Sequence, residues 1–225
     1  MDILAVIATC SALTFGTGIP EQSYPYTEGQ CREAKQTYQT RITQIKITPQ
    51  ERVALGRVTL AEAANQGEAG WSGVIYTVFN RLVSSGFGDS IQAIINQPGQ
   101  FEPVTKVGGD WRNLPALTEV DQAKIDTIIN LALQGRLPDL TNGGIFFQNP
   151  RIVAERERDG QVSKGLTGFY GAPEVAQIKD HTFYAAIPGE VSSHPQGRNR
   201  KNEKLESDIM GIATEEKKPG SVFSN

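Results

Sequence analysis

The sequence has few of the residues that bind metals or cross-link small proteins. Its 225 residues include only two cysteines and two histidines, and neither histidine lies in an HExxH pattern. These numbers exclude a disulfide framework, a four-thiolate zinc site and a metalloprotease of the HExxH type. We therefore expect the protein to use no metal and no cofactor.

An excess of positive charge and a phosphate-binding loop are missing as well. The 22 lysines and arginines stand against 25 acidic residues, for a formal charge of −3. This balance does not suit neutralisation of a nucleic-acid backbone, so we expect no nucleic-acid partner. The absence of a GxxxxGK[ST] motif gives no support to an ATPase. A hydrophobic fraction of 38% is typical of a globular domain, and the length allows one domain with appendages.

No charged residue occurs between Ile3 and Pro20. The run is interrupted by polar residues and glycines and is only just long enough to cross a bilayer. Asp2 stands where an export signal normally carries a positive charge. Three interpretations of residues 1–20 remain open: an atypical or truncated signal, a weak anchor that contacts a membrane through residues 3–20, or a buried arm. Cys10 and Cys31 could pair in an oxidising compartment or stay free thiols in a cytosol.

The two ends of the chain are predicted to flank a single domain over residues 48–185. Residues 186–225 contain six acids, six bases and little apolar material, a composition typical of a flexible polar tail. Residues 21–47 are predicted to form a helical extension that precedes the domain.

Hydrophobic periodicity predicts an α+β domain that is mainly α, with short strand segments. Thr48, Pro49 and Glu51 form a capping box that predicts a helix from Pro49 to about Asn65. Further helices are predicted over 28–43, over an apolar stripe at 71–82, after a cap at Asp89, and from Thr118 to Gly135. Residues 145–147 and 181–184 are predicted to be extended.

Glu62 does not fit the polar face of its predicted helix. At 100° per residue it lies within about 20° of Leu55 and about 40° of Val58, on the side that faces the core. Desolvation raises the pKa of a buried carboxyl, which suits a general acid near neutral pH. The alternative is a structural carboxyl that reaches solvent or an arginine such as Arg81.

Four ordered blocks around and after Glu62 resemble the SleB/CwlJ-type cell wall hydrolases, which include spore-cortex-lytic enzymes. The resemblance covers roughly residues 50–185. Its blocks are residues 53–63 followed by Asn80-Arg81, the QPGQF segment at 97–101, residues 141–147 with Asn149-Pro150, and the H-x-F-Y segment at 181–184.

This resemblance implies a compact, lysozyme-like domain that acts on the glycan strands of peptidoglycan. Family enzymes cut the β-1,4 bond between N-acetylmuramic acid and N-acetylglucosamine, and the glutamate that matches Glu62 is their catalytic acid/base. Some are lytic transglycosylases, in which the muramic 6-hydroxyl attacks C1. That chemistry needs one proton-shuttling carboxyl. It suits this sequence, in which no second carboxylate is convincing; Glu68, Glu102 and Asp110 are available in loops.

One position departs from the family pattern. Many members carry a second acid four residues after the catalytic glutamate, where this chain has Gln66. A neutral amide can position substrate but cannot carry charge, and Glu68 could substitute if the loop shifts, so both residues are candidates for substrate binding. The resemblance also implies substrate contacts by several further residues, each with a structural alternative: Gln100 and Asn149 through hydrogen bonds, Phe101 and Tyr184 through stacking, and His181 through a hydrogen bond. Asn80 is expected to make a structural contact with a loop.

Two functions follow from these observations. The first is a peptidoglycan-cleaving enzyme, exported to the periplasm or cell wall or carried by a phage particle. The second is a non-catalytic wall-binding or virion structural protein that keeps the fold. A retained Glu62 favours the enzyme.

Overall fold

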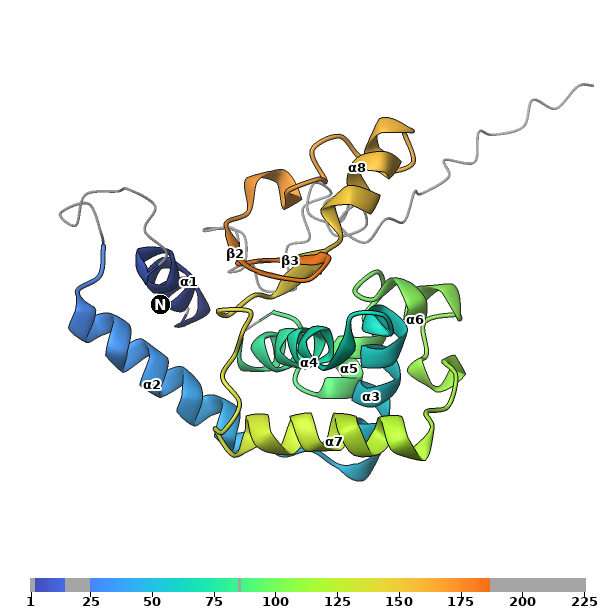
Figure 1. Ribbon diagram of the computed structural model, residues 1–225, viewed down its shortest axis with the longest axis horizontal. Helices are drawn as coiled ribbons and strands as arrows, with labels where there is room; N and C mark the ends of the chain where they lie inside the picture. Colours follow the sequence, from blue (N-terminus) through green and yellow to red (C-terminus); the bar gives the residue numbers. More distant parts are fainter. Residues whose placement is uncertain (1–2, 15–24, 85, 187–225) are drawn as a thin grey trace, which may run out of the picture.

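The computed structural model describes residues 3–14, 25–84 and 86–186, and these form a mainly helical α+β fold with one small sheet (Figure 1). The fold class predicted from the sequence is therefore confirmed. The elements follow in the order α1 (Ile3–Thr14), α2 (Glu28–Gln44), α3 (Pro49–Ala63), α4 (Gly67–Val83), α5 (Ile91–Asn96), α6 (Glu102–Lys106), α7 (Glu119–Leu133), β1 (Phe146–Gln148), α8 (Pro150–Arg158), β2 (Glu174–Ile178) and β3 (His181–Tyr184).

Side-chain caps fix where the helices begin. Thr48 and Glu51 form the predicted capping box at the start of α3, and Thr27 forms a second one with Gln30 at the start of α2. Each box satisfies backbone N–H groups that have no partner inside the helix. The cap of α5 is Ser90, whose hydroxyl accepts a hydrogen bond from the Ala93 N–H. The prediction of Asp89 at this position was wrong by one residue.

Helix α4 lies at the centre of the molecule. All twelve residues from Gly70 to Arg81 are buried, and the helix packs against α2, α3, α5, α7 and β2. A helix that is apolar on most of its circumference must be covered on most of its circumference. The neighbouring helices and the sheet supply that cover (Figure 1).

The sheet is antiparallel, with β3 between β1 and β2. Phe183 of β3 pairs with Phe147 of β1 and with Ala176 of β2. A Cβ atom on Gly73 of α4 would lie 2.6 Å from the Phe183 ring. The absence of a side chain at residue 73 therefore lets β3 approach the central helix, and α8 continues directly from β1 on this side of the molecule (Figure 1).

A buried polar network fixes the loop that leads into β1. The Asn80 side chain donates to the carboxylate of Asp139, to the hydroxyl of Thr141 and to the carbonyl of Gly144. The Tyr38 hydroxyl also bonds Asn80 and Asp139, which ties α2 to the same loop. The expected contact of Asn80 with a loop is confirmed.

The N-terminal segment is a helix that packs on the rest of the fold. Helix α1 contacts α2 and β2, and Ile3, Leu4 and Ile7 belong to the main hydrophobic core. A disulfide joins Cys10 of α1 to Cys31 of α2. Within the described ranges, no helix has both the length and the apolar character needed to span a membrane. The predicted polar tail lies outside the described residues from 187 onward.

Candidate functional site

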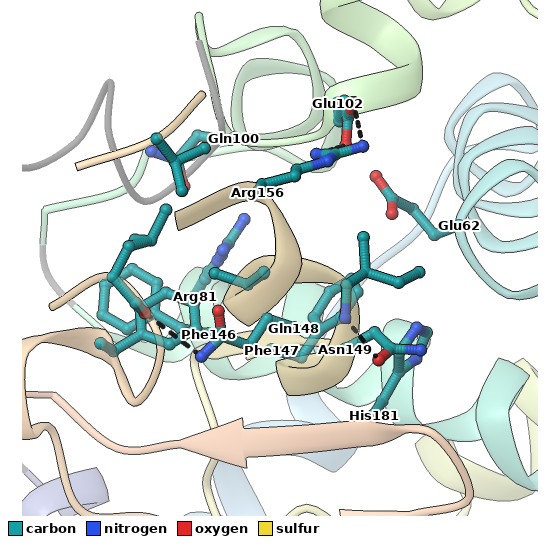
Figure 2. Close-up of a pocket in the computed structure, with 15 residues that line it drawn as sticks. Glu62, Arg81, Gln100, Glu102, Phe146, Phe147, Gln148, Asn149, Arg156 and His181 are labelled. Atoms are coloured by element: carbon teal, nitrogen blue, oxygen red, sulfur yellow. Dashed lines mark hydrogen bonds and ion pairs between the residues drawn. The ribbon is translucent and has the colours of Figure 1, made fainter. Parts of the chain in front are cut away.

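One cavity of about 200 Å³ contains Glu62 and lies between the helical layer and the sheet with α8 (Figure 2). Helices α3, α4 and α6 contribute Glu62, Arg81 and Glu102 to its wall. The opposite side comes from β1, α8 and β3. The residues that line the whole cavity are Glu62, Arg81, Gln100, Glu102, Phe146, Phe147, Gln148, Asn149, Ile152, Val153, Arg156, Val162, Leu166, Phe169 and His181.

The surroundings of Glu62 favour the protonated form of its carboxyl. Burial, followed by the negative charge of Glu102, raises the pKa of Glu62 to about 8, against opposing contributions from Arg81 and Lys106 and from a hydrogen bond with the Glu102 backbone. Glu62 keeps partial exposure while it lines the cavity. A protonated carboxyl at neutral pH that a ligand can reach is the arrangement required of a general acid.

Glu102 is the second carboxylate of the cavity, and it is ionised. Its two oxygens accept hydrogen bonds from the two terminal nitrogens of Arg156, at 3.2 and 3.3 Å. Lys106 adds an ion pair at 2.7 Å. These partners hold the pKa of Glu102 below its ordinary value in spite of the opposing effect of desolvation. The two glutamates therefore differ in protonation at neutral pH.

Arg81 is a buried cation in the same cavity. Only 1% of its surface is exposed, and its Nε donates a 2.8 Å hydrogen bond to the carbonyl of Ile145. The rings of Phe87, Phe101 and Phe146 lie 5.0 to 5.7 Å from the guanidinium carbon. Burial lowers the pKa of Arg81, but a guanidinium keeps its proton at neutral pH.

Among the substrate-binding candidates, the structure brings Gln100, Asn149 and His181 to the cavity wall together with Glu62. Asn149 is also the cap of α8, since its side-chain oxygen accepts hydrogen bonds from the next two N–H groups that lack helical partners. Burial lowers the pKa of His181, although Asp180 opposes the shift. Its imidazole is therefore neutral at neutral pH.

Phe101 and Tyr184 stand behind the cavity wall. Phe101 packs on the Arg81 guanidinium. The Tyr184 hydroxyl accepts a hydrogen bond from the Gln148 amide, which does line the cavity. Both aromatic residues are almost fully buried, so they support lining residues and present no open stacking face.

Gln66 and Glu68 are not brought to the cavity. The Gln66 side chain is buried against the turn before β3, where it bonds the Asp180 carboxylate and the Asp180 N–H. Glu68 is exposed and lines a different pocket, beside Lys124 and Leu140. The Gln66 side chain therefore connects the start of α4 to the turn before β3.

Sequence reasoning missed Phe147, Gln148 and Arg156 as lining residues. Arg156 lies on α8, a helix with no buried residue, so no hydrophobic pattern marks it. Gln148 ends β1 and stands next to the recognised Asn149-Pro150 pair, which is the one signal that could have indicated it. In the part of the chain that the structure describes, no cluster of three or more His, Cys, Asp or Glu side chains could hold a metal.

Comparison with known proteins decides the family. A family model described as cell wall hydrolase matches residues 65–184, just over half of the chain. The chain belongs to the cell wall hydrolase family. The match includes every lining residue except Glu62, which lies three residues before its start. No curated protein and no solved structure matches the chain.

Membership in the cell wall hydrolase family gives the protein a general function. It supports an enzyme that degrades peptidoglycan, and it implies a site of action at the cell wall or outside the cell. The resemblance read from the sequence motifs is confirmed by this match. The expected likeness to lysozyme stays a prediction.

Proposed function

We propose that the protein cleaves the β-1,4 bond between N-acetylmuramic acid and N-acetylglucosamine as a lytic transglycosylase, with Glu62 as general acid and base. The observation that carries this proposal is that Glu62 lines a cavity of a cell wall hydrolase where burial raises its pKa to about 8. The glycan strand occupies the cavity with its scissile oxygen against the Glu62 carboxyl.

In the first half of the reaction, Glu62 donates its proton to the glycosidic oxygen. The bond between that oxygen and C1 of the muramic sugar breaks, and positive charge develops on C1. The ionised Glu102 helps to keep the proton on Glu62 until this step, because two negative carboxylates close together disfavour each other.

In the second half, the Glu62 carboxylate accepts the proton of the muramic 6-hydroxyl. The 6-oxygen then forms a bond to C1, and the product carries a 1,6-anhydro ring. The attacking hydroxyl belongs to the same sugar, so its effective concentration is high and no bound water is needed. Glu62 ends the cycle protonated, as it began.

A hydrolase with two carboxylates is the runner-up, and Glu102 replaces Glu68 as its candidate second residue. Such an enzyme needs a base or nucleophile with a free oxygen. Both oxygens of Glu102 accept hydrogen bonds from Arg156, and one also contacts Lys106. This pairing lowers the basicity of Glu102 and favours the mechanism that uses Glu62 alone.

The non-catalytic alternative, a wall-binding or virion structural protein, makes no use of a raised pKa at Glu62. Desolvating the Glu62 carboxyl costs stability, and a purely structural protein has no reason to retain that cost. The disulfide between Cys10 and Cys31 supports a site of action in an oxidising compartment. We therefore propose an exported or particle-borne enzyme whose partner is the peptidoglycan glycan strand.

The first test is Glu62→Gln in a turbidity assay on purified peptidoglycan. The amide has the shape of the acid but cannot donate the required proton, so the rate should fall by about 10² to 10⁴. Glu33→Gln is the matched control, because Glu33 is an exposed carboxyl of α2 that does not line the cavity. Clearing by Glu62→Gln at the rate of the control would remove Glu62 from the mechanism.

A further inference from the structure

Four buried polar atoms of the cavity wall have no hydrogen-bond partner among the described residues. They are Nη1 of Arg81, Oε1 of Gln100, Oε1 of Gln148 and Nδ1 of His181. The four residues are between 1% and 8% exposed. A buried donor or acceptor without a partner costs stability, so such a group calls for an explanation. Ten such side-chain atoms occur in the described residues, and four of them belong to residues that line this one cavity. Their grouping there indicates that a ligand completes them.

Arg81 supplies a charged hydrogen-bond donor whose position is fixed by its neighbours. Its Nε is held by the Ile145 carbonyl, and its plane is packed between aromatic rings. The guanidinium therefore cannot turn away to find another acceptor. Because the group is buried and charged, the ligand atom that meets Nη1 must be a hydrogen-bond acceptor.

The glutamines supply acceptors. The Gln148 amide nitrogen donates to the Leu166 carbonyl and to the Tyr184 hydroxyl. This uses both of its hydrogens and leaves the oxygen for the cavity. Gln100 presents a second unpaired oxygen, and Figure 2 draws Arg81 between Gln100 and Gln148. The ligand must therefore bring a donor as well as an acceptor.

Apolar side chains complete the surroundings. Phe146, Leu166 and Phe169 line the same cavity. A small group that matches them has an N–H for a glutamine oxygen, a carbonyl for the arginine and a methyl for the apolar wall. We propose that Arg81, Gln100 and Gln148 form a subsite for the acetamido group of an N-acetylated sugar, an assignment that rests on the proposed function of the cavity.

The same residues disfavour two other ligand groups, a free amine and a carboxylate. A free amino group, as in de-N-acetylated glycan, is protonated and brings a second positive charge to Arg81 without offering it an acceptor. A carboxylate suits Arg81 but brings no hydrogen for Gln100 or Gln148. Unpaired buried groups penalise a wrong ligand more strongly than a missing methyl does. The protein should therefore discriminate against de-N-acetylated peptidoglycan.

The test uses the full chain on three preparations of one peptidoglycan: native, enzymatically N-deacetylated, and the deacetylated material re-acetylated with acetic anhydride. At pH 6 the free amines are protonated and Glu62 is protonated. The cleavage rate should fall at least about tenfold on deacetylated material and recover after re-acetylation. Equal rates on the native and deacetylated preparations would overturn the subsite.

A charge change in the subsite should weaken the preference for acetylated material. Gln148→Glu places a carboxylate beside the site, which accepts an ammonium group and offsets the charge of Arg81. The ratio of native to deacetylated rates should fall at least threefold. Gln97→Glu is the control, because Gln97 also has a buried unpaired oxygen but does not line the cavity. An equal change in both variants would contradict the proposal.

Co-sedimentation with the insoluble preparations separates this proposal from the proposed function. If the protein cleaves neither preparation but sediments only with the acetylated ones, the subsite stands and the lytic function fails. If it cleaves native and deacetylated material at equal rates and sediments equally with all three preparations, the lytic function stands and the subsite fails.

Discussion

Glu62 and Glu102 share one cavity but hold their protons differently. Glu62 is desolvated and lies near a negative charge, whereas Glu102 stays ionised because it forms ion pairs with Arg156 and Lys106. The environment of Glu62 depends on Glu102, because the charge on Glu102 contributes to the raised pKa of Glu62. This dependence gives a prediction that a purely structural role of Glu102 would not.

The pH profile of the wild-type enzyme should have an alkaline limb near pH 8, where Glu62 loses its proton. Glu102→Gln removes a negative charge and leaves Arg156 and Lys106 unpaired. Both changes favour the ionised form of Glu62, so the limb of kcat/KM should move to lower pH while activity persists on its acid side. A loss of about 10² or more at every pH would instead identify Glu102 as a base or nucleophile.

At the residue scale, the sequence indicated Glu62 because one carboxyl on an apolar helix face is conspicuous. It could not indicate that Glu102 would lie close to Glu62, because this proximity depends on how α6 packs against α3. It also could not separate Gln100, which lines the cavity, from Phe101, which stands behind it. Adjacent residues of one loop take opposite sides only once the chain is folded.

At the scale of elements, the close packing of β3 against α4 sets the position of the part of the cavity wall that β3 contributes. Gly73 leaves no side chain between the central helix and Phe183, and β3 also carries His181 into the cavity. A larger residue at this contact must displace the sheet or the helix. The position of the wall is therefore sensitive to a single methyl group.

Gly73→Ala should destabilise the fold by about 1 to 3 kcal/mol through overpacking, less a gain of up to about 1 kcal/mol from helix propensity. Gly29→Ala is the matched control, because Gly29 is an exposed helical glycine whose added Cβ would meet nothing closer than 3.9 Å. It should be neutral or slightly stabilising. Thermal melts of the two variants measure the difference, and equal melting temperatures would contradict the tight contact.

The sequence predicted the elements that carry local signals. The capping box at Thr48 and the apolar stripe of α4 were sufficient to place α3 and α4. The strand β2 and the helices α6 and α8 were missed. The strand β2 is half exposed and irregularly paired, and α6, which carries Glu102, has only five residues and was expected to be a loop. The helix α8 buries no residue, although Asn149 and Pro150 at its start form a local helix signal that the sequence carries.

At the scale of the whole molecule, α1 connects the beginning of the described chain to its last strands. It packs on β2 as well as on α2, and Leu4 and Ile7 stand close to the loop at Gly143. The sequence left three interpretations of this segment open. Its packing could not be derived from composition, because a run of apolar and small residues suits a membrane or a core equally well.

Replacing Cys10 and Cys31 together by serine should lower the free energy of unfolding by about 3 kcal/mol. The disulfide closes a loop with a sequence separation of 21, and removing it restores conformational freedom to the unfolded chain. Melting with and without a thiol reductant measures the effect, and the reductant should not change the double variant. An unchanged wild-type melting temperature in reductant would show that the disulfide contributes nothing to stability.

The most direct test of the central claim, that Glu62 alone shuttles the proton, is mass spectrometry of the fragments released from purified peptidoglycan. An internal attack by the muramic 6-hydroxyl gives 1,6-anhydro ends, which are lighter than hydrolysed ends by one water and resist borohydride reduction. Anhydro fragments should dominate the digest. A digest of hydrated, reducible fragments alone would mean that water is the attacking group, and that Glu62 works with a second carboxylate such as Glu102.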